Sequence, residues 1–268
     1  MTFNIRFSTA PDGPDAWPLR RELLMRTIEA YRPDLLGMQE VLPDQLEALK
    51  QRLKGHAAVA VGRDADGQGE MSALLFRSDR FEKLRDGTFW LSATPDVPGS
   101  KGWDAQIPRI VTWAELRDRA AGGRALFVFN THWDHRGARA RAESAKLMRQ
   151  RIRAIAGDAP VIVTGDFNAP DGCDPHRDLT AAAGEWRLTD AYRALHPQRA
   201  ADQFTFHAFT GRSDRPRVID WILHSPHFQA RAATIDRTNE NGRYPSDHFP
   251  VTAELMWTAQ APPATRAR

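Results

Sequence analysis

Cysteine and long apolar runs are scarce in this sequence, and each scarcity excludes a class of protein. A single cysteine, Cys173, among 268 residues rules out an intramolecular disulfide and any metal site built from a cysteine cluster. No apolar run comes near the roughly 18 residues of a membrane-spanning helix, so we expect no membrane span. No secretory leader precedes the first alternating segment, residues 2–6. We therefore expect a soluble protein whose compartment stays open: cytoplasmic as the chain stands, or periplasmic or secreted if a leader was removed upstream.

The sequence also lacks a large excess of positive or negative charge. Lysine and arginine total 37 against 34 aspartates and glutamates, a net charge of +3, and only five of the basic residues are lysines. A protein that binds nucleic acid without sequence preference carries a stronger basic stripe. The composition therefore permits an anionic substrate without requiring one. With 41% apolar and 26% charged residues, the chain is typical of a globular protein and not of a disordered or fibrous one.

Short apolar runs alternate with amphipathic stretches along the whole chain. Apolar residues at helical spacing predict helices at 19–31, 43–53 and 137–156. Many strands, few helices and no long linker favour one α/β domain over residues 1–258, with sheets packed face to face and helices outside. We expect the tail 259–268 to be disordered. Runs rich in β-branched and aromatic residues predict strands at 35–41, 57–61, 73–76, 110–116, 126–130, 161–164, 218–223 and 251–257.

Polar side chains follow apolar runs where we expect strands to end. Asp166 and Asn168 come directly after the run 160–164 and lie two positions apart, so in an extended segment both point to the same side. A carboxylate beside an amide suits a hard cation or an attacking water. An ordinary Asp/Asn turn explains this tetrapeptide equally well.

Two more acidic positions stand next to apolar segments. Asp247 and His248 precede the last apolar run and together supply an acceptor and a tunable proton carrier, although capped loops commonly hold such a pair. Asp220 lies inside the apolar segment 217–222. Because a buried carboxylate without a partner is costly, we expect Asp220 to face a cation or a donor. A structural pairing with an arginine is the equal alternative.

Two further strand ends and the interior of the first strand carry the same kind of residue. Glu40 ends the run 35–39, and Asn4 stands in the first predicted strand, where asparagine is rare. The segment 130–135, Asn-Thr-His-Trp-Asp-His, closes another strand with two imidazoles and a carboxylate. Each has an explanation as a strand-end cap, but five separate strand ends carry one, which favours a shared functional site. We expect Trp133, inside this segment, to form a pocket wall.

Taken in order, these motifs resemble the endonuclease/exonuclease/phosphatase superfamily, which includes the deoxyribonucleases. The resemblance covers residues 4–248. The residue sequence of its motifs is most similar to that of the bacterial metal-dependent hydrolase branch, near the deadenylases. It implies a four-layer α-β-β-α sandwich of two mixed β-sheets flanked by helices, with the site where strand-end loops of both sheets meet. The motifs are Asn4, Gln39-Glu40, Asn130-Thr131-His132, Gly165-Asp166-Phe167-Asn168, Asp220 and Ser246-Asp247-His248.

The resemblance implies a metal site. Glu40, Asn4 and Asp247 would hold Mg²⁺, with Mn²⁺ as a substitute. This agrees with the chemistry, because hydrolysis of a phosphoester places charge on the phosphoryl oxygens and on the leaving group. An oxygen-rich, cysteine-free set of ligands also suits Mg²⁺.

The resemblance also implies roles in the reaction. Asp166 would orient and deprotonate the attacking water, and Asn168 would position the water and the phosphate. His248, steered by Asp220, would present an imidazolium to the phosphate, since an Asp that holds a His raises the pKa of the ring.

The resemblance extends to three further residues, of which Arg109 is the looser match. His132 corresponds to a second histidine of the family, and its acidic partner would be Glu70. Arg109 resembles a position that clamps the phosphate.

These roles imply an enzyme, a Mg²⁺-dependent phosphoester hydrolase that acts as a monomer on a phosphodiester. A nuclease acting on DNA or RNA is the alternative, so nucleic acid is a possible but not a required partner. A more remote alternative is a zinc hydrolase like the metallo-β-lactamases, whose His-x-His-x-Asp-His motif is similar to 130–135 but needs a histidine where Asn130 stands. A binding module that lost its chemistry is disfavoured, because each catalytic position holds the expected type of residue.

Overall fold

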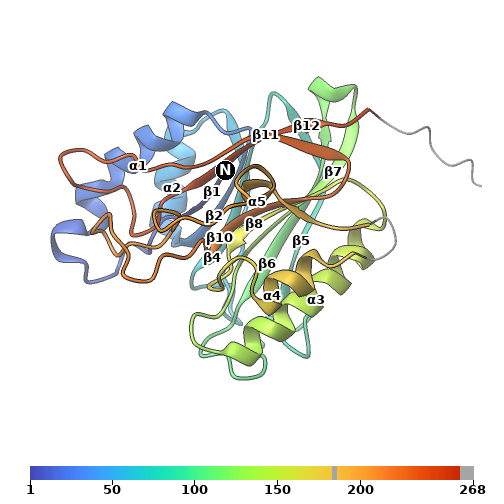
Figure 1. Cartoon of the computed structure of the whole chain (residues 1–268), viewed down its shortest axis with the longest axis horizontal. Helices are drawn as coiled ribbons and strands as arrows, with labels where there is room; N and C mark the ends of the chain where they lie inside the picture. The colour runs from blue at the N-terminus through green and yellow to red at the C-terminus, as the bar shows by residue number, and fades with distance from the viewer. Residues whose placement is uncertain (183–185, 260–268) are drawn as a thin grey trace, which may run out of the picture.

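Two six-stranded β-sheets lie face to face in the computed structural model, and helices cover their outer sides (Figure 1). The structure describes residues 1–182 and 186–259. This arrangement confirms the predicted α/β sandwich of two mixed sheets. Residues 260–268 of the predicted disordered tail lie outside the described residues. Within the described ranges, no helix combines the length and the apolar character needed to cross a membrane.

The first sheet has the strand order β11-β12-β1-β2-β4-β3. Strand β1 is parallel to β2 and antiparallel to β12, so the sheet is mixed. Its strands are β1 (Thr2–Asn4), β2 (Leu35–Val41), β3 (His56–Val59), β4 (Met71–Arg77), β11 (Phe228–Ile235) and β12 (Val251–Trp257).

The second sheet has the order β5-β6-β7-β8-β10-β9. Strand β7 is parallel to β8, whereas β10 is antiparallel to β8. Its strands are β5 (Phe81–Trp90), β6 (Ile110–Asp118), β7 (Arg124–His132), β8 (Val161–Asp166), β9 (Thr189–Asp190) and β10 (Asp220–His224).

Each sheet has its own covering helices. Leu24 and Ile28 of α1 and Leu49 of α2 pack with Leu36 and Met38 of β2, which buries the outer face of the first sheet. Helix α3 buries Met148 and Ile152 in the larger core that includes the second sheet. The helices are α1 (Trp17–Tyr31), α2 (Pro43–Arg52), α3 (Ala138–Ala156), α4 (Asp174–Thr180) and α5 (Ala191–Leu195), with single 3₁₀ turns η1 (Gly13–Asp15) and η2 (Arg119–Ala121).

The three predicted helices are α1, α2 and α3. Strands β5, β9 and β11 had no predicted counterpart: β9 has only two residues, and charged or polar side chains interrupt the apolar residues of β5 and β11. In β5 the residues from Glu82 to Asp86 include four charged side chains, and in β11 buried residues alternate with exposed ones such as Gln229. Such strands bury only one face, and they take their place from their neighbours in the sheet.

Strand register brings the polar strand ends to one edge of the sandwich. Asn4 pairs with Gln39 across β1 and β2, and Asp166 pairs with His132 on one side and with Asp220 on the other. The two sheets meet at this edge, since Asn4 Nδ2 donates to Asp166 Oδ2 at 2.9 Å. Strand ends far apart in sequence therefore form one site.

A buried polar cluster fixes the two sheets to each other behind this edge. Asn130 Nδ2 of β7 donates to the carbonyl oxygens of Met38 (2.8 Å) and Ala73 (2.9 Å) in the first sheet. Asn130 Oδ1 accepts from Gln39 Nε2 at 2.7 Å. The sheets approach closely here, and a Cβ on Gly37 would lie 2.1 Å from Thr164 Oγ1. Hydrogen bonds and close packing between the two sheets therefore hold the strand ends in position.

Candidate active site

A pocket of about 390 Å³ opens at the edge where the two sheets meet. It gathers side chains from the ends of β1, β2, β7 and β8 and from the loops before β4, β6, β10 and β12. Apart from Asn4, Asp220 and Trp133, every predicted site residue lines it. The lining residues are Arg6, Phe7, Glu40, Glu70, Ile107, Arg109, His132, His135, Asp166, Asn168, Phe206, Ile219, Asp247 and His248.

Glu40 and Asn4 lie side by side at one end of this pocket. Asn4 Nδ2 donates to Glu40 Oε1 at 3.0 Å, and the backbone N–H of Phe7 donates to Glu40 Oε2 at 3.2 Å. Glu40 has a left-handed backbone (φ +60°), and the pairing of β2 with β4 is irregular at this point. Such an irregularity re-aims a side chain at the edge of a sheet. At Glu40 the irregular pairing occurs where the side chain points toward Asn4.

Asp247 supplies a second carboxylate near Glu40. Ser246 Oγ donates to Asp247 Oδ1 at 3.2 Å and to the carbonyl oxygen of Asn4 at 2.7 Å. Burial, with the neighbouring charges of Asp247 and Glu70, raises the pKa of Glu40. Acidic groups that repel one another in a buried site are the arrangement that a cation relieves.

His248 stands between two buried aspartates. Its Nδ1 lies 2.9 Å from Asp220 Oδ2, and its Nε2 lies 3.7 Å from Asp166 Oδ2. Burial alone lowers the pKa of His248, but the charges of Asp220 and Asp166 outweigh it and raise that pKa well above 6.5. The ring is therefore an imidazolium at neutral pH.

These three residues also form a possible metal-binding group. Ligand atoms of Asp166, Asp220 and His248 all lie within 4.8 Å of one another. A metal ion bound to Nδ1 of His248 would replace the hydrogen bond between this nitrogen and Asp220. Asp166, Asp220 and His248 are therefore one candidate cation site, and Glu40, with Asn4 and Asp247 nearby, is another.

Asp166 is the centre of the site. Its Oδ2 accepts from Asn4 and lies 3.4 Å from His132 Nε2, and its Oδ1 accepts from the backbone N–H of Asn168 at 2.9 Å. Burial, with the charge of Asp220, raises the pKa of Asp166 to about 7. A carboxylate with a pKa near neutrality can take a proton from water.

Asn168 and His132 form the wall beside Asp166. Asn168 Nδ2 lies 3.0 Å from His132 Nε2 and donates to the carbonyl oxygen of Trp133 at 3.0 Å. Burial, with the charges of Arg109 and Arg63, lowers the pKa of His132 well below 6.5. The site therefore pairs one charged histidine, His248, with one neutral histidine.

Glu70 and Arg109 lie next to His132, but the partner of Glu70 differs from the predicted one. Glu70 pairs with Arg63 (Oε2 to Nη1, 2.7 Å) and not with His132, because the loop before β4 brings the arginine to it. Arg109 is 4% exposed, and within residues 1–182 and 186–259 its Nε and Nη1 have no hydrogen-bond partner. A buried guanidinium with free N–H groups at a pocket is suited to an anion.

Trp133 does not form a pocket wall. Its side chain is fully buried, packs edge-on against Phe167 and Trp221, and directs its indole nitrogen to Met148 Sδ at 3.1 Å. His132 and Trp133 are consecutive, so their side chains point to opposite sides of an extended chain. With His132 in the pocket, Trp133 faces the core under α3.

Several pocket residues escaped the sequence motifs. Arg6, Phe7, Ile107 and Phe206 stand in segments without a polar strand-end pattern. His135 belongs to the quoted segment 130–135, and its second imidazole was the signal available in the sequence. Three pocket residues, Arg6, Glu40 and Asn168, have positive φ angles, a strain that clusters at functional sites.

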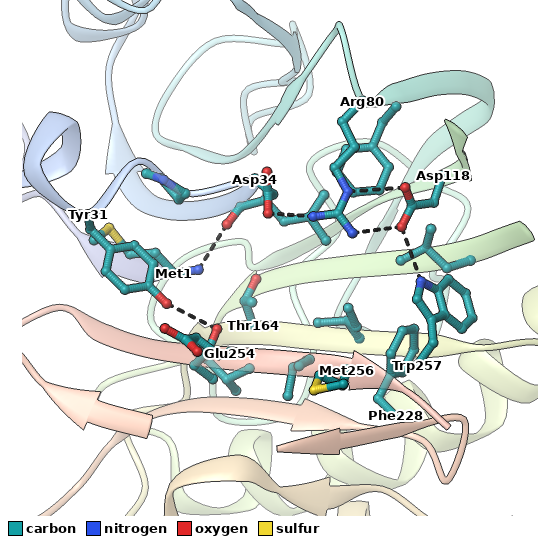
Figure 2. Close-up of a pocket in the computed structure, with 18 of the residues that line it drawn as sticks. Met1, Tyr31, Asp34, Arg80, Asp118, Thr164, Phe228, Glu254, Met256 and Trp257 are labelled. Carbon is teal, nitrogen blue, oxygen red and sulfur yellow. Dashed lines mark hydrogen bonds and ion pairs between the residues drawn. The ribbon is translucent and has the colours of Figure 1, made fainter. Parts of the chain in front are cut away.

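A second cavity, of about 430 Å³, lies beside the start of β1 (Figure 2). Its lining is largely apolar, and Arg80 contacts both Asp34 (2.6 Å) and Asp118 (2.8 Å) there. Asp118 also accepts from Trp257 Nε1 at 3.1 Å. In the part of the chain that the structure describes, the possible metal-binding group lies at the first pocket and not here. We therefore locate the reactive chemistry at the first pocket.

Comparison with known proteins agrees with this geometry. The model of the endonuclease/exonuclease/phosphatase family matches residues 1–248. The chain belongs to this family. Its members hydrolyse phosphoester bonds as nucleases, phosphatases and phosphodiesterases and depend on divalent metal ions. The predicted class of enzyme is thereby confirmed, and the metallo-β-lactamase-like alternative is excluded.

Solved structures of this family superpose on almost the whole chain. A family member from Bacteroides vulgatus is 36% identical, with 96% of this chain and 97% of that chain covered and a TM-score of 0.87. A mannosyl-6-phosphatase from Bacteroides thetaiotaomicron is 34% identical (96% and 98% covered, TM-score 0.85). The human Nocturnin catalytic domain with bound sulfate is 25% identical (95% and 91% covered, TM-score 0.72).

Curated sequences give more distant relatives. Nocturnin of Drosophila melanogaster is 23% identical over 94% of this chain, which spans 44% of that protein. Nocturnin of Rattus norvegicus is 25% identical over 97% of this chain, which spans 66% of that protein. The chain thus spans between about half and two thirds of the length of these relatives.

Proposed function

We propose that this protein is a Mg²⁺-dependent phosphodiesterase in which Asp166 activates the attacking water. The observation that carries the proposal is the position of Asp166, which contacts the amide of Asn4 on one side and lies 3.4 Å and 3.7 Å from the two histidines on the other. One carboxylate therefore adjoins the candidate metal ligands and the candidate phosphate-binding side chains at once.

Glu40 and Asp247 offer carboxylate oxygens to a Mg²⁺ ion, and Asn4, whose Nδ2 donates to Glu40 and whose Oδ1 also accepts from the backbone N–H of Arg6, would add its amide oxygen. The raised pKa of Glu40 reflects its burial beside other acids, and oxygen donors of this kind are the ligands that Mg²⁺ prefers. When bound, the ion would neutralise charge on the phosphoryl oxygens.

The chain's own residues then carry the reaction. Asp166 accepts a proton from the water as the water oxygen bonds to phosphorus and the bond from phosphorus to the leaving oxygen breaks, and the leaving oxygen, which keeps the electron pair of that bond, takes up a proton from solvent. Asn168 holds the water through its amide oxygen, because its Nδ2 is already used by Trp133 and His132. His248 donates to a phosphoryl oxygen as charge accumulates there.

Arg109 binds the same phosphate from the opposite wall. Among the described residues its Nη1 has no hydrogen-bond partner and is a donor for a phosphoryl oxygen, whereas its Nε faces Asp134 Oδ2 at 3.7 Å. Glu70, held by Arg63, orients this wall next to His132. Trp133 supports Asn168 through its carbonyl oxygen and takes no part in contacts with the substrate.

A second candidate function is hydrolysis of a sugar phosphate monoester. The observation that favours it is the 34% identity over almost the full length with the mannosyl-6-phosphatase. Both candidates use the same metal site and the same water, and they differ in whether the phosphate carries one organic group or two.

A substrate comparison with metal control tests the proposal. Bis(p-nitrophenyl) phosphate, p-nitrophenyl phosphate, mannose 6-phosphate and supercoiled plasmid are each incubated with the protein and with the His248→Ala variant. Chelator should abolish hydrolysis and Mg²⁺ should restore it, with the diester hydrolysed faster than the monoesters. Faster monoester hydrolysis would favour the second candidate, and plasmid nicking by the wild type alone would identify a nuclease. Hydrolysis unaffected by chelator would contradict the mechanism.

A further inference from the structure

The rim of the active-site pocket carries two exposed side chains, His135 and Phe206. The other lining residues are buried or half-buried. Neither rim residue takes part in the reaction described above. Their position at the mouth places them where the organic group attached to the phosphate would lie.

The backbone at His135 is held in a fixed turn by its neighbour Asp134. Asp134 Oδ1 accepts from the backbone N–H groups of Arg136 (2.9 Å) and Gly137 (2.6 Å), and Oδ2 accepts from that of Gln106 (3.0 Å). Asp134 is 1% exposed. His135 is therefore a rigidly mounted residue although its ring is exposed.

The orientation of the His135 ring is set by Arg109, whose Nη2 lies 3.0 Å from His135 Nδ1. A guanidinium can only donate, so Nδ1 accepts and the ring proton is on Nε2. Burial and the charge of Arg109 lower the pKa of His135, which keeps the ring neutral. Nε2 has no hydrogen-bond partner in the described ranges, so the rim presents one free N–H donor.

Phe206 gives the rim an apolar face. Its side chain is 44% exposed, although large aromatic residues are usually buried. Its ring centre lies 5.1 Å from that of His248, and its backbone forms a β-bridge with His248. The apolar face is thus fixed beside the reacting centre.

An N–H donor and an aromatic face on one rim match a ring that has hydroxyl groups and an apolar C–H face. We propose that His135 is a specificity-determining residue, which donates from Nε2 to a hydroxyl or ring oxygen of the substrate and, with Phe206, selects phosphoesters of carbohydrates. This inference rests on the proposed function, because it assigns the organic part of the same substrate.

Variants at His135 distinguish hydrogen bonding of its Nε2 to the substrate from hydrogen bonding of its Nδ1 to Arg109. In His135→Asn the amide oxygen can replace Nδ1 as the acceptor for Arg109, but the Nε2 donor is lost. In His135→Ala both are lost. His227→Asn, at a partly exposed histidine outside the pocket, is the matched control. Nitrogen-15 NMR of the imidazole nitrogens of the wild type should show the proton of His135 on Nε2.

Each variant is assayed on two pairs of esters, in each of which a sugar replaces one p-nitrophenyl group. The pairs are p-nitrophenyl phosphate with mannose 6-phosphate, and bis(p-nitrophenyl) phosphate with the p-nitrophenyl diester of glucose 6-phosphate. His135→Asn should lower kcat/KM about fivefold to tenfold on the sugar member, the effect of one lost hydrogen bond, and leave the other member within about twofold. His135→Ala should lower both, and His227→Asn neither.

Equal losses on both members of a pair in His135→Asn would overturn the inference, and so would a ring proton on Nδ1. A wild type that hydrolyses the p-nitrophenyl esters with Mg²⁺ but neither sugar ester would overturn this inference alone. A wild type without metal-dependent hydrolysis of any of the four would overturn the proposed function, and the inference with it.

Discussion

The guanidinium of Arg20 donates through Nη1 to the carbonyl oxygen of Pro245 at 2.9 Å, although 225 positions separate the two residues. The same nitrogen donates to the carbonyl oxygen of Ile5 at 2.8 Å. Ile5 follows the candidate ligand Asn4, and Pro245 shortly precedes the candidate ligand Asp247. Burial lowers the pKa of Arg20 to about 10, so the side chain stays charged at neutral pH. One buried cation thus joins two of the three chain segments of the candidate metal site, the segments of Asn4 and Asp247.

Replacing this cation should weaken metal binding. Arg20→Lys keeps the charge but has too few donors for all the carbonyl groups that Arg20 contacts. We expect the Mg²⁺ concentration for half-maximal activity to rise about tenfold, while kcat at saturating Mg²⁺ changes little. Arg21→Lys, on an exposed neighbour (side chain 48% exposed), is the control. An unchanged metal titration in Arg20→Lys would rule out this positioning role.

The two raised pKa values predict how the rate depends on pH. Asp166 must be ionised to accept a proton, so activity should rise as pH increases through about 7. His248 must stay protonated, so activity should fall once pH exceeds its raised pKa. In Asp220→Asn, the charge that raises both values is gone, and both limbs of the kcat profile should move to lower pH. A kcat profile with unchanged limbs would show that Asp220 does not set the pKa values of Asp166 and His248.

The inter-sheet contacts of Asn130 predict a large effect on stability. Asn130→Ala leaves Gln39 Nε2 and the carbonyl oxygens of Met38 and Ala73 with fewer partners. We expect the free energy of unfolding to fall by about 3 kcal/mol, measured by urea denaturation. Thr131→Val, which removes a single bond to the carbonyl oxygen of Ile110, should cost about 1 kcal/mol. Equal losses of unfolding free energy in the two variants would contradict the proposal that Asn130 holds the two sheets together.

His207 should make the fold sensitive to acid. Burial, and to a lesser extent the charge of His248, lower the pKa of His207 from 6.5 to about 3. The unfolded chain binds a proton at His207 more readily, so its contribution to stability is present above pH 6.5 and is lost as pH falls toward 3. His207→Phe, which keeps an aromatic ring against Phe249, should reduce the drop in Tm between pH 7.5 and 5.5. An identical drop in both proteins would contradict this assignment.

The sequence motifs predicted the edge of the sandwich where the pocket lies, because a polar residue after an apolar run marks the end of a buried strand. The motifs did not predict which side chains contact one another within the site. Glu70 meets Arg63, because a loop whose path depends on tertiary contacts carries the arginine. Phe206 could not be found either, since nothing local distinguishes an exposed phenylalanine from a buried one. The error at Trp133 was avoidable, because alternation along the strand already placed it opposite His132.

The catalytic role of Asp166 is tested most directly by the kcat of Asp166→Asn at saturating Mg²⁺, on whichever p-nitrophenyl ester the wild type hydrolyses. Asp118→Asn is the matched control, since Asp118 is as deeply buried but lies at the other cavity. Asp166→Asn should lower kcat about a thousandfold with the fold intact by circular dichroism, and Asp118→Asn should leave kcat within about twofold. A folded Asp166→Asn variant whose kcat stays within tenfold of the wild type would contradict the mechanism.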